Sequence, residues 1–353
     1  MSQSTRPAPA SLAAIAERVE GRLISLIDAE SSRWAHLDSE LSRPFQALAD
    51  LTLAGGKRLR PAFCTWAFVA GGGDPTDALV VNAGAAFEML HGFALFHDDV
   101  MDGSSTRRGQ RTVHLEYADR HASQEWRGEG RRFGEGVAIL VGDLAFVYAD
   151  LLMTGVSAMA AALWHELRIE LNIGQYLDVL GTASGAVTYD GAMRIARLKS
   201  GKYTVERPMH LGAALAGRPE LIEPFSDYAL PLGDAFQLRD DVLGVFGDEE
   251  STGKPVGDDL REGKPTPMLA IATERATASQ HETLALIGCR ELTIDEVGAI
   301  QRVLINTGAL DAIEDTIAVN TLDAIEKIQT APIPPEARDA FVELAQYVAW
   351  RDR

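Results

Sequence analysis

The sequence is poor in cysteine, in aromatic residues and in basic residues. Its 353 residues include 2 Cys and 7% aromatic residues, and 33 Lys+Arg stand against 51 Asp+Glu, for a formal net charge of −18. Two cysteines, Cys64 and Cys289, cannot form a disulfide framework, which favours a reducing, cytoplasmic compartment. The acidic excess argues against a nucleic-acid binder and against a general binder of anionic lipid, because both depend on Lys and Arg.

Long hydrophobic runs are also missing. The longest apolar stretch, Val137 to Met153, is interrupted by Asp143 and Asp150, whereas a spanning helix needs about twenty mostly apolar residues. The apolar stretch Leu12 to Ile15 is too short for the core of a signal peptide. We therefore expect no membrane span and no signal peptide, and we expect residues 1–9 to be disordered because they are polar and contain proline.

What the sequence does contain is helical periodicity. Apolar residues recur every three or four positions, and no segment shows the strict alternation of a half-buried strand. The periodic segments are Leu12 to Ile27, Phe87 to Val100, Leu163 to Leu180, Tyr228 to Phe246 and Leu310 to Ile328. The breaks between helices are short, and no Pro/Ser linker separates two domains. The pattern predicts an all-α protein with one large helical domain over residues 1–353.

Two charged segments interrupt this periodicity. Gly103 to Gly136 is rich in arginine, and Gly247 to Pro267 mixes aspartate with lysine. We expect both to be long irregular loops, which in a compact domain are usually functional or disordered. Each closely follows a pair of aspartates, which directs attention to the chemistry of those pairs.

The first pair belongs to an acidic cluster at a predicted helix end. Asp98 and Asp102 are four residues apart and share one helix face, with Asp99 about 100° round the helix. Three carboxylates there repel one another and lie near the negative end of the helix dipole. A divalent cation would relieve this, and one or two carboxylates completed by water and substrate phosphates are typical of Mg²⁺. The alternative for such a cluster alone is a solvated acidic helix end.

A second pair, Asp240 and Asp241, follows another apolar helix. Basic residues follow both pairs in the sequence. Lys57, Arg58 and Arg60 also lie at a predicted helix start that is preceded by two glycines, where backbone N–H groups favour an anion. Alone, that basic segment would be interpreted as a solvated turn. Two acidic clusters facing each other, with basic groups between them, would form a site for a metal-bound diphosphate.

These residues resemble the trans-isoprenyl diphosphate synthases, or polyprenyl synthetases. The resemblance is collinear from Gly55 through Lys264, and the ordered set of motifs is highly specific. The matching segments are Gly55-Gly-Lys-Arg-Leu-Arg-Pro61, Glu88-Met-Leu-His91, His97-Asp-Asp-Val-Met-Asp102, Arg107-Arg-Gly109, Gly142-Asp-Leu144, Gly174-Gln-Tyr-Leu-Asp178, Lys199-Ser200, Phe236-Gln-Leu-Arg-Asp-Asp241, Gly253-Lys254 and Gly263-Lys264.

The resemblance implies a single helical bundle with a central active-site cavity, and it implies a role for each of several residues. Asp98 and Asp102, with Asp99 nearby, would hold two Mg²⁺ ions on the diphosphate of an allylic substrate, and Asp240, beside Asp241, would hold a third. Gln237 would line the reacting centre and stabilise positive charge. The allylic diphosphate would be bound by Arg107, Lys199 with Ser200, Lys254 and Lys264, and isopentenyl diphosphate by Lys57, Arg60, His91 and Arg108. A His one helical turn from core residues, such as His91, is often simply part of the core.

The implied activity is head-to-tail chain elongation. Isopentenyl diphosphate would condense with dimethylallyl, geranyl or farnesyl diphosphate after ionisation of the allylic C–O bond, and the released diphosphate would accept the proton. Two departures from the family pattern stand out. Position 244, where the second acidic motif usually ends in a third Asp, is Gly244, which predicts weaker binding of the third metal ion, and Ser200 stands where Thr is commoner.

Product length is predicted from the helix ahead of the first acidic motif. Phe93, five residues before Asp98, resembles the channel floor of short-chain synthases, and Ala94 beside it leaves more room than a second aromatic residue. We expect geranylgeranyl diphosphate (C20), with farnesyl diphosphate (C15) or longer chains as alternatives. The competing interpretation is that Phe93 is an ordinary core residue.

Three functions are considered: a prenyl elongase, a class I terpene cyclase and a regulatory subunit of a heteromeric synthase. A class I terpene cyclase also uses an Asp-rich metal site but would give Lys57, Arg60 and Arg108 no role, and a regulatory subunit would commonly lack an Asp motif. The elongase is the leading interpretation. The family is usually homodimeric, so we expect a homodimer by resemblance, although the sequence shows no coiled-coil heptad or apolar stripe that requires one.

Overall fold

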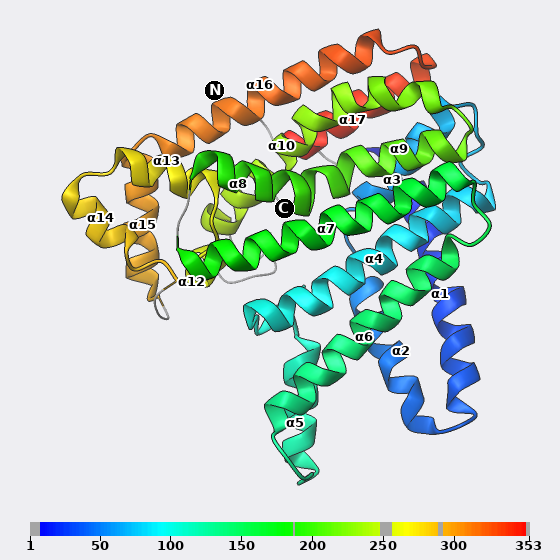
Figure 1. The fold of residues 1–353 in the computed structure, drawn as a ribbon, viewed down its shortest axis with the longest axis horizontal. Helices are drawn as coiled ribbons and strands as arrows, with labels where there is room; N and C mark the ends of the chain where they lie inside the picture. The colour runs from blue at the N-terminus through cyan, green and yellow to red at the C-terminus, as the bar shows by residue number, and fades with distance from the viewer. Residues whose placement is uncertain (1–7, 186–187, 248–255, 289–291, 351–353) are drawn as a thin grey trace. The chain divides into compact units, whose positions relative to one another are not determined.

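A computed structural model of the chain describes residues 8–185, 188–247, 256–288 and 292–350. Lys254, Cys289 and nearly all of the predicted disordered N-terminal segment lie outside these ranges. The described chain is helical almost throughout, as the periodicity predicts, with one antiparallel pair of two-residue strands (Figure 1). The all-α fold is therefore confirmed.

Contacts divide the chain into two compact units. The N-terminal unit comprises Ala10–Thr65 and Gly73–Ser157, and the C-terminal unit comprises Trp66–Gly72 and the chain from Ala158 onward. Helix α3 (Leu59–Ala70) contributes residues to both. The other elements of the N-terminal unit are α1 (Ala10–Ala35), η1 (Ser39–Ser42), α2 (Arg43–Thr52), α4 (Ala78–Asp102), β1 (Thr106–Arg107), β2 (Gln110–Arg111), α5 (Val113–Ser123) and α6 (Gly130–Leu152).

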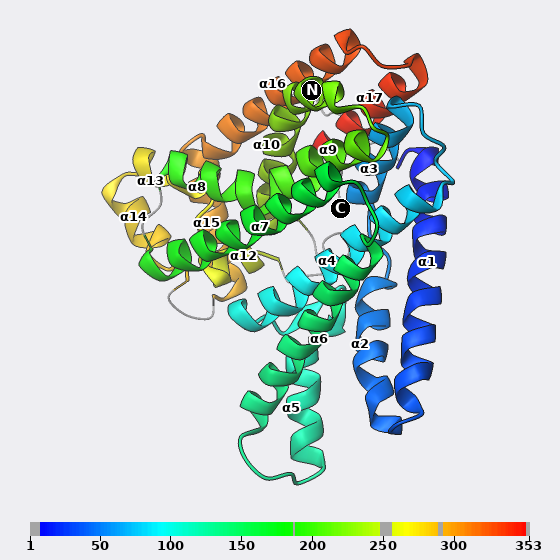
Figure 2. The same ribbon diagram turned by 45° about the vertical axis from the view of Figure 1, so that its right-hand side comes forward.

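The N-terminal unit is organised around α4. This helix packs against α6, α1 and α2, and α4 and α6 lie side by side in both views (Figures 1 and 2). Alanines such as Ala85 and Ala86 are fully buried, so neighbouring helices can approach closely. Among the described residues, α4 is the one helix long and apolar enough to cross a membrane, but 61% of its apolar window is buried inside the protein, as in a core helix.

The C-terminal unit is larger and is organised around a second long helix, α10. Besides the end of α3, its elements are α7 (Ala158–Ser184), α8 (Tyr189–Ala196), the π-helix η2 (Arg197–Glu206), α9 (Arg207–Leu215), η3 (Pro219–Leu221), α10 (Ile222–Phe246), α12 (Asp258–Glu262), α13 (Pro267–Arg275), α14 (Ala278–Leu284), α15 (Ile294–Asn306), α16 (Ala309–Thr330) and α17 (Pro335–Ala349). Helix α10 packs against α16, η2, α17 and α12.

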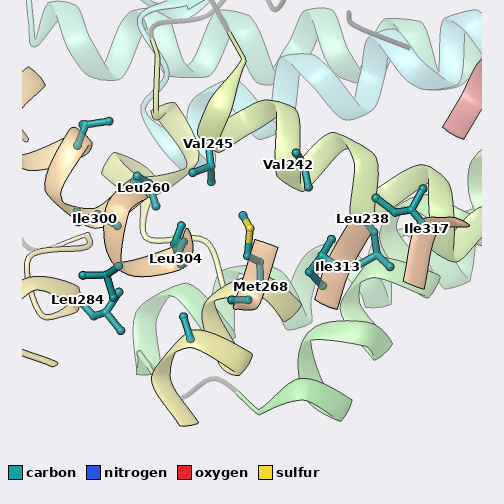
Figure 3. Close-up of a cluster of buried hydrophobic side chains, with 14 of the residues drawn as sticks. Leu238, Val242, Val245, Leu260, Met268, Leu284, Ile300, Leu304, Ile313 and Ile317 are labelled. Atoms are coloured by element: carbon teal, nitrogen blue, oxygen red, sulfur yellow. The ribbon is translucent and has the colours of Figure 1, made fainter. Parts of the chain in front are cut away.

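The core beside the second acidic pair is purely apolar. Leu238, Val242 and Val245 on one face of α10 contribute to the same cluster as Ile313 and Ile317 of α16 (Figure 3). The spacing of the α10 residues is the three-to-four-residue period that the sequence shows. Because this apolar face is buried, the rotation of α10 about its axis is fixed, and with it the directions in which Asp240 and Asp241 project.

The two segments predicted as irregular loops contain more regular structure than expected. Within residues 103–136, a turn after α4 leads to the β1–β2 hairpin, the whole of α5 and about the first two turns of α6. The described part of the second segment contains α12. Helix α5 was missed because its buried face is formed by His114, Tyr117 and His121 rather than by aliphatic residues.

A buried histidine gives the C-terminal unit a defined pH response. His210 Nε2 lies 2.8 Å from Ser226 Oγ, and Ser226 donates to Glu206 (3.1 Å). Arg207 lies 3.4 Å from Nδ1 and can only donate, so the ring is neutral with its proton on Nε2. Burial, with the positive charges of Arg207 and Lys202, lowers the pKa of His210 to about 4.

Stability should therefore fall as the pH drops from about 6.5 to about 4, because only the unfolded chain binds the proton in that window. One such proton corresponds to about 1.4 kcal/mol of unfolding free energy per pH unit. We expect His210→Gln, which keeps a donor for Ser226, to reduce the slope of unfolding free energy against pH by this amount in denaturant titrations. An unchanged slope would contradict the assignment of a neutral native histidine.

Candidate active site

The first acidic cluster lies at the C-terminal end of α4, as predicted. Gly103 ends the helix with a left-handed backbone (φ 67°), and its N–H donates to the carbonyl of Asp99. Asp98 and Asp102 are half-buried and lie one helical turn apart on the same face, whereas Asp99 is buried (4% exposed). The three carboxylates therefore do not have equivalent positions.

Asp99 is held by the predicted substrate-binding residue Arg107. The Arg107 guanidinium on β1 donates from Nε (2.8 Å) and Nη2 (2.5 Å) to Asp99 Oδ1, and Nη2 is 3.9 Å from Asp98 Oδ2. The tight β1–β2 turn brings Arg107 back onto the helix end that precedes it. This pairing reduces the repulsion within the cluster and fixes the hairpin against α4. Asp99 therefore positions Arg107.

The predicted basic helix start is confirmed, but its three cations differ. Lys57 and Arg60 are half-buried at the beginning of α3, whereas Arg58 is 3% exposed and its backbone is left-handed (φ 48°). Arg58 bonds to Glu88 on α4, to Glu20 on α1 (2.9 Å) and to the carbonyl of Thr52 (2.7 Å). This residue is a structural cation that holds the Gly-rich segment in place.

Arg108 and His91 lie close to the same segment. Arg108 Nη1 donates to the carbonyls of Leu51 (2.8 Å) and Gly55 (2.5 Å), so part of its guanidinium binds the peptide chain that precedes Lys57. Burial, followed by the charges of Arg60 and Arg108, lowers the pKa of His91 well below its ordinary value. A neutral His91 can donate one hydrogen bond without adding to the positive charge.

In the C-terminal unit, Lys199 and Ser200 lie in the π-helix η2. Lys199 Nζ is 2.5 Å from Asp178 Oδ2 on α7. A Cβ on Gly174 would lie 2.5 Å from the backbone nitrogen of Lys199, so only glycine permits this approach of α7 to η2. The wide turn of a π-helix, which is common at functional sites, places Lys199 against α7.

The two aspartates of the second acidic pair also differ in burial. Asp241 is 6% exposed and accepts a hydrogen bond from Gln237 Nε2 (2.7 Å), whereas Asp240 is half-buried. Burial, with the negative charges of Asp259 and Asp240, raises the pKa of Asp241 well above its usual range, and Gln237 and Lys264 oppose the shift. The bond to Asp241 orients Gln237, which is the residue predicted to line the reacting centre.

The donor chemistry of these segments fits Mg²⁺. In the described part of the chain, no three His, Cys, Asp or Glu side chains converge to hold a metal ion by themselves. A Mg²⁺ site does not require such a cage, since one or two carboxylates commonly bind it together with water and substrate phosphates. Asp98 and Asp102 at one helix end, and Asp240 in the other unit, are hard oxygen donors of this kind.

Three carboxylates in the site region received no role from the sequence. Glu88 and Glu20 bind Arg58, and Asp178 binds Lys199. Glu88 and Asp178 lie within matched motifs, but nothing in a single sequence shows which cation each carboxylate meets. The signal that could have found Glu88 is a charged residue inside an apolar helix segment, because such a residue is almost never buried unless it is paired.

The Phe93 side chain projects from α4 toward α6. Its ring lies 4.7 Å from that of His97 and 4.7 Å from that of Phe146 on α6, and it is half-buried. Ala94 is also half-buried. Phe93 therefore differs from Phe87 on the same helix, which is fully buried.

Removing the Arg58 side chain should strongly destabilise the protein. We expect Arg58→Met to lower the unfolding free energy by about 3–5 kcal/mol, because Glu88 (5% exposed) would be left buried without its cation. The double variant Arg58→Met/Glu88→Leu should recover much of this loss. Urea titration measures both, with Arg33→Met as the control, since Arg33 is 68% exposed and its pair with Glu30 contributes at most about 1 kcal/mol. A loss below about 1 kcal/mol for Arg58→Met would contradict this interpretation.

Comparison with known proteins agrees with the geometry. The Polyprenyl synthetase family matches residues 41–304. A short chain isoprenyl diphosphate synthase of Methanothermobacter thermautotrophicus is 33% identical over 320 residues, covering 87% of this chain and 90% of that protein. A geranylfarnesyl diphosphate synthase of Aeropyrum pernix is 32% identical over 312 residues, covering 85% of this chain and 92% of that protein.

A solved structure extends the similarity to the fold. The geranylgeranyl pyrophosphate synthase of Corynebacterium glutamicum, solved with isoprenyl diphosphate and magnesium, has a TM-score of 0.91 and 35% sequence identity, and the match covers 96% of this chain and 99% of that one. Family, relatives and fold all agree with the order of motifs in the sequence. The chain belongs to the polyprenyl synthetase family and is a trans-prenyltransferase.

Proposed function

We propose that this prenyltransferase condenses isopentenyl diphosphate with allylic diphosphates in a Mg²⁺-dependent reaction and that its main product is geranylgeranyl diphosphate. The observation that carries the proposal is the end of α4, where Asp98 and Asp102 share one face beside the Arg107–Asp99 pair. This arrangement offers oxygen ligands to a cation and a guanidinium to a phosphate at the same helix end. The C. glutamicum protein, solved with isoprenyl diphosphate and magnesium, supports this assignment.

In this mechanism the protein binds two diphosphates by different means. Lys57, Arg60, His91 and Arg108 bind isopentenyl diphosphate through N–H donors without metal. Because Arg58 and Arg108 hold the segment from Leu51 to Arg60 through its backbone, Lys57 and Arg60 are positioned before the substrate arrives. Such preorganisation lowers the entropic cost of binding.

The allylic diphosphate is the group that leaves. Asp98, Asp102 and Asp240 would hold three Mg²⁺ ions, which when bound neutralise negative charge on the departing diphosphate. Arg107, Lys199, Lys254 and Lys264 would donate to its oxygens, with Ser200 as an additional donor. The oxygen of Gln237, whose amide nitrogen donates to Asp241, would stabilise positive charge on the allylic carbon. The isopentenyl double bond attacks that carbon, and the departed diphosphate takes the proton.

Loss of either predicted ligand on the α4 face should greatly reduce turnover without unfolding the chain. We expect Asp98→Ala or Asp102→Ala to reduce turnover by roughly 10²-fold or more, because transition-state charge is then poorly neutralised. The assay combines purified protein, Mg²⁺, isopentenyl diphosphate and each of dimethylallyl, geranyl and farnesyl diphosphate. Asp28→Ala, at an exposed position of α1, is the control, and circular dichroism verifies the helix content.

Two outcomes would contradict the proposal. Wild-type protein that incorporates no isopentenyl group with any primer would exclude chain elongation. Wild-type turnover in the Asp98 and Asp102 variants would exclude their role as metal ligands while leaving the elongation activity in place.

Overall identity does not decide product length, since relatives at 32% and 30% identity are named for geranylfarnesyl and geranylgeranyl diphosphate, respectively. Phe93 stands five residues before Asp98 and is backed by the Phe146 ring. An aromatic pair at this depth would stop the growing chain, and the small Ala94 beside it leaves room for a C20 rather than a C15 product. Farnesyl diphosphate and longer chains are the alternatives that the product assay distinguishes.

Shortening the aromatic side chain should lengthen the product. We expect Phe93→Ala to shift the main product by at least one C5 unit, because removing the ring opens space between α4 and α6. Products are sized by chromatography after dephosphorylation. The control is Phe133→Ala, since Phe133 is a half-buried residue of α6 that packs on Trp126 (5.3 Å) and His121 (5.5 Å). An unchanged product from Phe93→Ala would show that Phe93 is an ordinary core residue.

We also propose that the protein is a cytoplasmic homodimer. Leu140, Val147 and Leu151 of α6 are 63%, 58% and 54% exposed and recur at helical spacing on one face. This exposed apolar stripe was not recognised in the sequence, and a second copy of the chain would remove it from water. Sedimentation equilibrium should give twice the mass of 38.1 kDa, and Leu140→Glu/Val147→Glu should give the single-chain mass. A monomeric wild type would contradict the dimer.

A further inference from the structure

The helices η2 and α10 contact each other backbone to backbone at a pair of glycines. A Cβ on Gly201 would lie 3.0 Å from the carbonyl carbon and oxygen of Gly233, and a Cβ on Gly233 would lie 2.9 Å from the carbonyl oxygen of Gly201. A side chain at either position would therefore push the two helices apart. The glycine pair sets how closely η2 and α10 approach each other.

Groups predicted to act on one substrate lie on both helices beside this contact. On η2, Lys199 is two residues before Gly201. On α10, Gln237 is four residues after Gly233 and so lies one helical turn along the same face, with Asp240 almost a further turn on. The angle at which the two helices cross therefore decides the distance from the lysine to the groups on α10.

A contact between glycines does not by itself fix a crossing angle. Helices usually take a defined angle because side-chain ridges of one fit the grooves of the other, and glycine contributes no ridge. The two helices could turn about this point without changing their separation. Contacts away from the glycines must therefore fix the rotation.

Arg197 and Asp234 provide such a contact. Arg197 donates from Nε to Asp234 Oδ1 (2.9 Å) and from Nη2 to Oδ2 (2.7 Å), so the guanidinium holds the carboxylate at two points. Asp234 is buried (6% exposed) and directly follows Gly233. Arg197 is the residue at which α8 ends and η2 begins, four residues before Gly201. Because a planar two-point contact is satisfied in one orientation, this ion pair fixes the direction of η2 relative to α10.

We propose that Arg197 and Asp234 are positioning residues for chain elongation, which hold Lys199 on η2 at a fixed distance from Gln237 on α10. The inference rests on the proposed function, because it concerns residues proposed to act on the allylic substrate. Neither member of the ion pair contacts that substrate. Isopentenyl diphosphate is bound by other residues, so its binding does not depend on the pair.

The first experiment determines whether Asp234 acts through Lys199. Asp234→Asn keeps the shape of the side chain but removes the charge that Arg197 binds. We expect it to lower kcat/KM for the allylic substrate by about tenfold or more and to change the KM of isopentenyl diphosphate by less than about twofold. In a Lys199→Ala background the same change should lower kcat/KM by less than about threefold, because the group that it positions is then missing.

Glu220→Gln is the matched control for this experiment. Glu220 lies in the same unit and is also paired with an arginine, Arg218, but its side chain is 58% exposed. We expect wild-type kinetics for this variant. If Asp234→Asn lowers kcat/KM by the same factor with and without Lys199, its effect does not pass through the lysine and the proposal is overturned.

A second variant separates the geometry of the ion pair from its charge. Arg197→Lys keeps a positive charge beside Asp234 but cannot bind the carboxylate at two points. Because the Arg197 side chain is 55% exposed, we expect the melting temperature to change by less than about 2 °C. The allylic kcat/KM should nevertheless fall by a factor similar to that of Asp234→Asn. Wild-type kinetics for Arg197→Lys would show that charge alone suffices and would overturn the positioning role.

The outcomes also separate this inference from the proposed function. If wild-type protein makes prenyl products and Asp234→Asn elongates them as fast, only the role of the ion pair is overturned. If the wild type incorporates no isopentenyl group with any primer, the proposed function fails and this inference fails with it.

Discussion

A carboxylate removed from water needs a cation or another hydrogen-bond donor, and this requirement organises both units of the protein. Asp99 at the end of α4 is held by Arg107, and Glu88 in the middle of the same helix is held by Arg58. In the C-terminal unit Lys199 meets Asp178. Each pair joins two elements that are separate in sequence, and breaking one partner would leave a buried charge at a cost of several kcal/mol. The pairs therefore fix the loops and helix ends that carry the residues predicted to bind substrate.

Neighbouring aspartates that look equivalent in the sequence differ in their burial and in their partners. The buried acids Asp99 and Asp241 bind protein partners, Arg107 and Gln237, and so orient groups predicted to meet the substrate. Asp98, Asp102 and Asp240 are less buried, and these are the three assigned to metal by resemblance. Burial thus provides a physical basis for the different roles within each Asp-Asp pair, because a metal ligand must remain accessible to the ion and to the substrate.

The fold and the site differ in how far a single sequence could predict them. The helices around Phe87, Tyr228 and Leu310 were predicted because their apolar residues recur at the helical period, which is a local property. Helix α5 was predicted as loop, since its buried face consists of two histidines and a tyrosine rather than aliphatic residues. The site residues came from motif order, whereas the inward orientation of Arg58 depends on a left-handed backbone and on α1 and α4 contacts that no local pattern encodes.

The sequence by itself determined the all-α class and the family, and it predicted the residues that would carry the chemistry, because periodicity and motif spacing are local properties of the chain. Only the tertiary structure decided which charges meet. It paired Arg107 with Asp99, and it placed Asp259 in the space beside Gly244, fifteen positions earlier in the chain. The physical reason is that a salt bridge or a steric conflict depends on distances between side chains, and those distances are set when distant helices pack together.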